Sequence, residues 1–159
     1  ERARLLAVRL VDFLRPEGVL PDLSGRAAPE VLAELCRPVA AMHGLEATRL
    51  LQALLDREKL GSTSVGEGVA IPHGRLAGLP ALTAVFGRAP AGVEFRAVDG
   101  KPVCLFLALF APENAAGLYV KVLARVSRLF RSPAFREAIL AAPDAAAIHR
   151  LIEVEDARE

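Results

Sequence analysis

Hydrophobic residues recur at helical spacing in two neighbouring segments near the start of the chain. The first segment begins at Pro29 and stops before Gly44, with apolar positions at Leu32, Leu35, Cys36 and Val39. The second begins at Ala47, has leucines at positions 50, 51, 54 and 55, and ends in a charged run at residues 56–59. Both stripes have the 3.6-residue period of an amphipathic helix. We therefore predict two helices, the second leading directly into the loop that starts at Gly61.

The middle of the chain has the short apolar and alternating segments that are typical of strands. Ala81–Phe86 and Val103–Ala111 are apolar runs, and residues 93–97 alternate between apolar and charged side chains. Asp99-Gly100 lies between the alternating segment and the second run, where it indicates an antiparallel hairpin. The short run Val69–Ile71 can also enter a sheet, in which case Pro72 would end its pairing and hold the next residue at the sheet margin.

Helical spacing returns after Pro112. Asn114 is placed to cap a helix that continues to Phe130. The apolar positions on one face of this helix are Leu118, Val122, Val126 and Leu129. Ser132-Pro133 and Asp144 are start signals for two shorter helices. The order of elements predicts an α/β fold: a single-domain sandwich over residues 1–159, with a mixed parallel and antiparallel sheet flanked by helices.

Composition and charge narrow the classes of partner and location. The 159 residues are 53% hydrophobic, and 20 basic against 19 acidic residues leave a net charge of +1, which does not indicate a nucleic-acid partner. Val103–Ala111 is far shorter than the roughly 20 residues of a membrane-spanning helix. Cys36 and Cys104 form no CxxC motif, and no apolar signal core follows Arg2 and Arg4. We expect free thiols, a cytoplasmic location and no membrane insertion.

The chemistry of the chain is concentrated around Ile71-Pro72-His73-Gly74-Arg75 and the preceding loop Gly61–Gly68. A histidine is largely neutral near pH 7, so its ring nitrogen can act as a nucleophile. Glycines let backbone N–H groups approach an anion, and Ser62, Thr63 and Ser64 add hydroxyl donors. Arg57, at the end of the second helix, can bring a guanidinium group to a phosphoryl group. These residues favour a histidine that carries phosphate.

Simpler interpretations remain open for each of these features. His73 can be an exposed loop histidine, Arg57 a solvated helix end, and Gly61–Gly68 a flexible turn. The loop has neither the Gly-Lys-Ser/Thr of a Walker A motif nor three dinucleotide-binding glycines, so we expect no nucleotide cofactor. His43 and His149 have no metal-ligand spacing with His73, so no metal is expected. A serine hydrolase using Ser62 or Ser64 is a distant alternative.

Taken as a block, Arg57–Gly74 closely resembles the signature of phosphotransferase-system enzyme IIA domains of the fructose/mannitol type, or type 2. The similarity is greatest to the nitrogen-regulatory branch. It extends through most of the chain, over Phe95–Val103, Leu109–Glu113 and Leu123–Phe130. The glycine spacing followed by Ile-Pro-His-Gly carries the resemblance, and the later segments are less specific.

This resemblance implies a phosphocarrier. In such a protein His73 accepts a phosphoryl group from the phosphohistidine of an HPr-like carrier, and then signals to a regulatory protein or passes the group to a IIB domain. Arg57, Ser62 and Thr63 fall at positions that line the family's phosphoryl pocket. The resemblance implies an α/β sandwich and leaves open whether the chain is an enzyme in its own right.

One position departs from the family pattern. Members commonly carry a second histidine at the start of the helix after Pro112-Glu113, and Tyr119 stands at that place here. Its hydroxyl can donate one hydrogen bond to a phosphoryl group, or the ring can simply pack there. The alternative function is therefore a regulatory interaction module in which phosphorylation is impaired.

Overall fold

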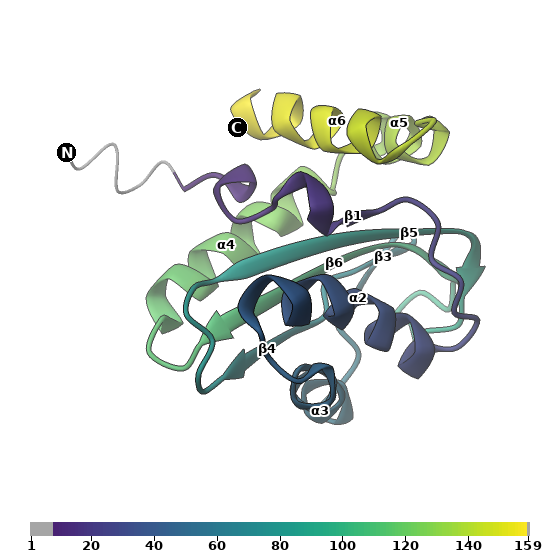
Figure 1. Cartoon of the computed structure of the whole chain (residues 1–159). Helices are drawn as coiled ribbons and strands as arrows, with labels where there is room; N and C mark the ends of the chain where they lie inside the picture. The colour runs from purple at the N-terminus through teal and green to yellow at the C-terminus, as the bar shows by residue number, and fades with distance from the viewer. Residues whose placement is uncertain (1–7, 159) are drawn as a thin grey trace.

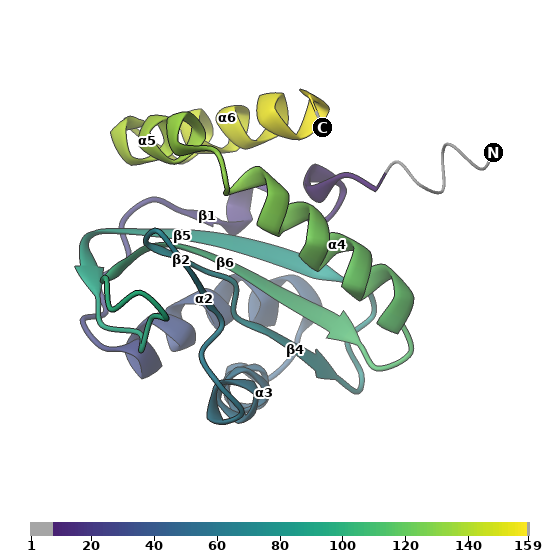
Figure 2. The ribbon, with the colours of Figure 1, turned by 180° about the vertical axis from the view of Figure 1, so that it is seen from behind.

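The computed structural model describes residues 8–158, which form a six-stranded sheet with helices on both of its faces (Figures 1 and 2). Helices α2 and α3 cover one face, and α4, α5 and α6 lie over the other. The predicted α/β class with a mixed sheet flanked by helices is confirmed. Arg2 and Arg4, on which the expectation about a signal segment partly rests, lie outside the described residues.

The two predicted N-terminal helices are confirmed as α2 (Ala28–His43) and α3 (Ala47–Lys59). Gly44 ends α2 in the left-handed conformation with φ +63°, which glycine adopts without a steric penalty. The apolar stripes of both helices are buried against the sheet. Since α3 ends at Lys59, its last turn delivers Arg57 to the start of the Gly61 loop.

The sheet is built around one central strand, β6 (Val103–Pro112). The other strands are β1 (Val19–Leu20), β2 (Ser64–Gly66), β3 (Val69–Ala70), β4 (His73–Leu76) and β5 (Thr83–Val93). Their order is β1-β5-β6-β3-β2. Strand β4 also pairs with β6, further along β6 than β3 does. The β5 pairing is antiparallel, whereas β3 and β4 run parallel to β6. Both faces of β6 are buried, which accounts for its unbroken apolar sequence.

Two predicted strands are in fact one long strand followed by a loop. The run starting at Ala81 continues as β5 to Val93, and residues 94–102 connect β5 to β6. Arg96 has φ +53°, which interrupts the extended backbone of a strand. The side chains of Val93 and Phe95 are nevertheless both buried, as the alternating pattern predicts. Asp99-Gly100 makes a turn inside this loop, where the Gly100 N–H donates to the Ala97 carbonyl at 3.0 Å. The predicted antiparallel hairpin is confirmed, since Val93 pairs with Val103, but its first strand ends at Val93 and not at Ala97.

The C-terminal helices are α4 (Ala116–Leu129), α5 (Pro133–Ala141) and α6 (Ala145–Arg158). The Ser132 hydroxyl and the Asp144 carboxylate each accept a backbone N–H of the following helix, as predicted. The predicted cap at Asn114 is wrong. The Ala115 N–H donates to the Pro112 carbonyl, so Asn114 lies inside a turn and α4 starts without a side-chain cap.

A buried ion pair joins the outer helices to the N-terminal segment of the fold. The Arg125 guanidinium pairs with Asp156 at 2.6 Å, and the second Asp156 oxygen accepts the Val11 N–H at 3.0 Å. This network ties α4 and α6 to the segment containing the short 3-10 helices η1 (Leu10–Asp12) and η2 (Pro16–Gly18). Within residues 8–158, no helix combines the length and apolarity required to cross a membrane.

The two cysteines are free thiols. Cys36 is buried in α2, where burial raises its pKa to about 12, and Cys104 on β6 is partly exposed. Burial also raises the pKa of Cys104.

Candidate functional site

His73 is the first residue of β4 and lies opposite Leu109 of the central strand. The expectation that Pro72 ends strand pairing is wrong. The Pro72 carbonyl accepts the Leu109 N–H at 2.9 Å, and pairing continues from His73 to Leu76. Proline lacks an N–H but keeps its carbonyl, so it can belong to a strand that pairs through the carbonyl alone. His73 is therefore part of the rigid sheet, as the predicted rigid support requires.

Two hydrogen bonds fix the orientation and the protonation of the His73 ring. Nδ1 lies 2.7 Å from the Ile71 carbonyl, and a carbonyl can only accept. Nδ1 therefore carries the hydrogen. The Nε–H of Arg57 donates to Nε2 at 3.2 Å, so Nε2 presents a lone pair. In this neutral tautomer, Nε2 is the nucleophilic atom.

The surroundings keep the imidazole neutral. Partial burial lowers the pKa of His73 below its ordinary value, because burial disfavours the charged form. The hydrogen bond to Ile71 opposes this shift, and the positive charge of Arg57 adds to the lowering of the pKa. The ring is thus available as a nucleophile at neutral pH.

Arg57 reaches His73 because α3 packs very close to β4. A Cβ atom on Gly74 would lie 3.2 Å from the Cβ of Ala53 and 3.3 Å from its carbonyl carbon and oxygen. Ala53 and Arg57 are four residues apart, so they share one face of the helix. The Arg57 Nη1 also donates to the Gly61 carbonyl at 2.9 Å, which fixes the guanidinium between loop and histidine. The structure brings together the two residues predicted as catalytic.

Tyr119, in the first turn of α4, approaches His73 from the other side. The ring centroids are 5.6 Å apart with an angle of 64° between the planes, an edge-on contact. Burial raises the pKa of Tyr119 to about 12, while the charges of Arg75 and Arg57 act in the opposite direction. Tyr119, which was predicted to lie at the phosphoryl site, therefore lies beside His73.

Ser62 and Thr63 use their hydroxyl groups inside the loop. The Ser62 hydroxyl donates to the Phe95 carbonyl at 3.0 Å and accepts the Ser64 N–H at 3.1 Å. The Thr63 hydroxyl donates to the Glu58 carboxylate, which also accepts the Thr63 N–H at 3.1 Å. These bonds hold the loop against α3 and the 94–102 connection. A direct role for either hydroxyl at a phosphoryl group stays a prediction.

Arg75 and the space that Gly74 leaves open were not among the sequence predictions. Both belong to β4, a strand that was not predicted because His-Gly-Arg-Leu has no apolar alternation. The sequence signal that could have identified Arg75 is its spacing from His73, since residues two apart on a strand share a face. Once His73 is placed on a strand, Arg75 falls on the same side of the sheet.

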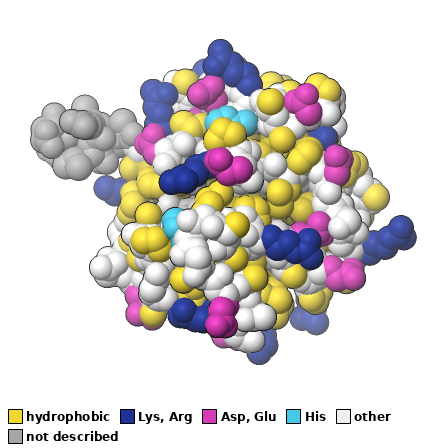
Figure 3. All heavy atoms as spheres, in the orientation of Figure 1, with side chains coloured by type: hydrophobic (Ala, Val, Ile, Leu, Met, Phe, Trp, Pro, Cys, Tyr) yellow, Lys and Arg dark blue, Asp and Glu magenta, His cyan; other side chains and the backbone are white. Residues whose placement is uncertain are grey.

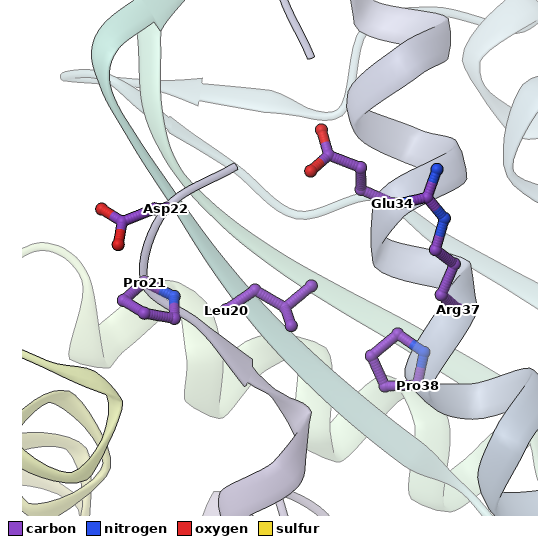
Figure 4. A pocket seen from close by; sticks show the side chains of 6 residues that line it. All are labelled: Leu20, Pro21, Asp22, Glu34, Arg37 and Pro38. Carbon is purple, nitrogen blue, oxygen red and sulfur yellow. The ribbon is translucent and has the colours of Figure 1, made fainter. Parts of the chain in front are cut away.

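Other features of the described surface lie apart from His73. Figure 4 shows a hollow between the end of β1 and α2, lined by Leu20, Pro21, Asp22, Glu34, Arg37 and Pro38. It lies at the opposite edge of the sheet from β4. In Figure 3, basic and acidic side chains are interspersed over the visible face. Among residues 8–158, no cluster of three or more His, Cys, Asp or Glu side chains could hold a metal ion.

Comparison with known proteins gives consistent matches. Residues 12–154 match the family described as phosphoenolpyruvate-dependent sugar phosphotransferase system, EIIA 2. A nitrogen regulatory protein of Bradyrhizobium diazoefficiens is 38% identical over 148 residues, 93% of this chain and 97% of that protein.

Solved structures agree. The nitrogen regulatory protein IIA-Ntr of Neisseria meningitidis is 33% identical and superimposes with a TM-score of 0.84 over 89% of this chain and 97% of that one. A complex of enzyme IIAMTL and phosphorylated enzyme IIBMTL from Escherichia coli is 20% identical, with a TM-score of 0.75 over 89% of this chain and 99% of the matched chain. This second likeness concerns the fold alone.

Proposed function

The chain belongs to the phosphoenolpyruvate-dependent sugar phosphotransferase system EIIA 2 family, and on this premise we propose that it is a phosphocarrier whose acceptor atom is Nε2 of His73. The resemblance to type 2 enzyme IIA domains is thereby confirmed. One observation carries the proposal. The Ile71 carbonyl holds the hydrogen on Nδ1, which leaves the Nε2 lone pair facing the Arg57 guanidinium.

The transfer is a displacement at phosphorus. The Nε2 lone pair forms the new N–P bond while the N–P bond of the donor phosphohistidine breaks, and the donor ring keeps that electron pair. No proton has to leave His73, because the attacking nitrogen carries none. The ring gains positive charge as the bond forms, and the Nδ1–H donated to the Ile71 carbonyl at 2.7 Å stabilises that charge.

Arg57 has two roles in succession. Before transfer its Nε–H lies on the lone pair of Nε2, at 3.2 Å, and so occupies the approach of the phosphorus atom. The guanidinium must therefore move aside when the donor arrives. Its planar set of donors can then bind the phosphoryl oxygens, where hydrogen bonds between charged groups are strong. The Gly61 carbonyl, which accepts from Nη1, keeps the side chain close during this exchange.

The proposed donor is an HPr-like phosphohistidine protein, and the proposed location is the cytoplasm. For the output, the E. coli IIAMTL structure is a complex with phosphorylated IIBMTL. The matched proteins of B. diazoefficiens and N. meningitidis are nitrogen regulatory proteins. The regulatory route is favoured because the chain covers 97% of the first of these proteins. A phosphoryl group on His73 adds negative charge to the surface, which can admit or reject a partner.

The proposal is tested by phosphorylating the chain with labelled phosphoenolpyruvate, enzyme I and an HPr-like protein. The natural chain should acquire acid-labile label, and His73→Ala should acquire none. His43→Gln and His149→Gln alter the only other histidines of the chain and should keep the label. Label that persists in His73→Ala, or is lost in either control alone, contradicts the proposal.

A second candidate, an interaction module with impaired phosphorylation, rests on Tyr119. Its ring centroid lies 5.6 Å from that of His73, so a histidine at position 119 would also lie beside the reacting ring. Comparing transfer rates of the natural chain and Tyr119→His separates the two candidates. A gain of about a hundredfold or more, equivalent to about 2.7 kcal/mol, supports impairment. A gain below about tenfold supports a working carrier.

A further inference from the structure

Arg75 lies two residues after His73 on the same strand face. His73 pairs with Leu109 and Arg75 with Ala111, and both partners belong to the core cluster beneath α4. The intervening Gly74 pairs with Phe110, which belongs to the cluster on the opposite face. Positions two apart on a strand are separated by about 6.6 Å, which an arginine side chain can span.

The guanidinium of Arg75 has no other task within the described residues. Arg75 is exposed, and its guanidinium forms no hydrogen bond or ion pair with another residue between positions 8 and 158. By contrast, Arg57, Arg88 and Arg125 each donate to oxygen atoms of the protein. Arg75 therefore keeps its full set of donors for a group that arrives from outside.

The charge of Arg75 acts on Tyr119, the residue that contacts the His73 ring. Arg75 acts on the pKa of Tyr119 more strongly than Arg57 does, although burial has the larger and opposite effect. Tyr119 in turn makes the edge-on contact with the His73 ring. The groups around the ring are therefore Arg57 at Nε2, Tyr119 at the edge, and Arg75 next to Tyr119.

We propose that Arg75 is a second phosphoryl-binding residue, which donates, together with Arg57, to the oxygens of the phosphoryl group on His73. This inference rests on the proposed function of His73. In this chain the free arginine on β4 supplies donors at the site where Tyr119 replaces the family's second histidine. Two guanidinium groups then share a group that carries about two negative charges at neutral pH.

A small-molecule donor isolates this role from partner docking. Phosphoramidate, which contains an N–P bond, is used to phosphorylate the natural chain, Arg75→Gln, Arg75→Lys and the control Arg37→Gln. Arg37 is exposed and lies on α2 at the hollow shown in Figure 4, at the far edge of the sheet. Phosphorus NMR follows the rate at which each chain accepts the phosphoryl group, and a pH titration of the phosphorylated chain then gives the pKa of that group.

We expect Arg75→Gln to raise the phosphoryl pKa, because a neighbouring positive charge is lost. We expect Arg75→Gln to slow acceptance of the phosphoryl group about tenfold or more, in the range of one charged hydrogen bond. Arg75→Lys should restore the pKa and only part of the rate, and Arg37→Gln should match the natural chain.

The outcomes separate this inference from the proposed function. If the natural chain forms phosphohistidine at His73 and Arg75→Gln shows the same phosphoryl pKa and the same rate, only the role of Arg75 is overturned. A change seen with the HPr-like donor but not with phosphoramidate also overturns it, because Arg75 would then serve docking. If the natural chain forms no phosphohistidine with either donor, the proposed function and this inference fail together.

Discussion

At the His73 ring, two hydrogen bonds of opposite direction determine which nitrogen can react. Nδ1 donates to the Ile71 carbonyl and Nε2 accepts from Arg57. The same pair of bonds explains why a ring beside an arginine remains a useful nucleophile. The arginine disfavours protonation of the ring without removing the lone pair.

The pKa of His73 is predicted to lie below 6.5, the ordinary value for histidine, because burial disfavours the imidazolium form. As pH falls, the ring stays neutral to lower pH than a free histidine does, so phosphoryl acceptance should persist in mildly acidic solution. Arg57→Gln removes a positive charge and should raise the pKa. An NMR titration of the histidine ring protons measures both values.

Arg37→Gln is the matched control for this titration, since it removes one exposed arginine away from the site. It should leave the His73 pKa unchanged. A His73 pKa at or above 6.5 in the natural chain would show that burial is not the dominant influence on this ring.

At the residue level, the sequence identified His73 and Arg57 because a specific spacing of glycine, proline and histidine carries that information. It could not show which nitrogen reacts, since the Ile71 carbonyl that fixes the tautomer is a backbone group whose position depends on the fold. The internal bonds of Ser62 and Thr63 were equally hidden, because their partners at Phe95 and Glu58 are reached only when the loop closes.

Among the secondary-structure elements, the close contact of α3 with β4 sets the geometry of the site. Gly74 provides that contact, since its missing side chain leaves room for Ala53. The glycine of the Ile-Pro-His-Gly sequence is thus explained by packing, since Gly74 is not among the glycines with positive φ.

Gly74→Ala should push α3 outward, because the added Cβ would lie 3.2 to 3.3 Å from side-chain and backbone atoms of Ala53. A helix backbone yields only by moving as a unit. We expect a loss of about 1 to 3 kcal/mol in the free energy of unfolding. Phosphoryl acceptance should also slow, since Arg57 moves with the helix. Urea unfolding and the rate of labelling measure the two effects.

Gly117→Ala is the control, because no atom lies within 4 Å of a Cβ added at that helical position. It should leave stability unchanged or raise it by up to about 1 kcal/mol. If Gly74→Ala is as stable and as fast as the natural chain, the α3–β4 contact does not position Arg57.

The helices were predictable because their apolar stripes are local and long. Strand β4 was not predictable, since it is held in the sheet by pairing with β6, more than 30 residues further along the chain. The alternation at residues 93–97 resembled a strand because Val93 and Phe95 face inward, whereas the positive φ of Arg96 follows from the loop as a whole.

For the whole molecule, the outer helices are joined to the sheet through a buried ion pair. Arg125 is 8% exposed and Asp156 is fully buried, and the pair is completed by the bond from Val11 to Asp156. Neither charge could be assigned to the core from the sequence, because the two residues lie on different helices and their neighbours give no sign of the pairing.

Asp156→Ala should cost about 3 to 5 kcal/mol of unfolding free energy, because it leaves the Arg125 charge buried without a partner. Urea unfolding measures the loss. Glu153→Gln on the same helix breaks an exposed pair with Arg150 and should change stability by less than about 1 kcal/mol. Equal effects of the two substitutions would show that the buried pair does not join the helices.

Replacing both partners, as Arg125→Met with Asp156→Leu, should recover much of that loss, since no charge is then left unpaired.

The strand order of the sheet on which these helices pack could not be predicted from the sequence either. It depends on which distant strands pair with β6, and the apolar sequences of β5 and β3 do not specify which of them lies on which side.

The most direct measurement is a long-range proton–nitrogen NMR spectrum of the phosphorylated chain, which identifies the nitrogen atom bonded to phosphorus. We predict phosphorus on Nε2 of His73, with Nδ1 still carrying its hydrogen toward the Ile71 carbonyl. Phosphorus on Nδ1, or on any other residue, would contradict it.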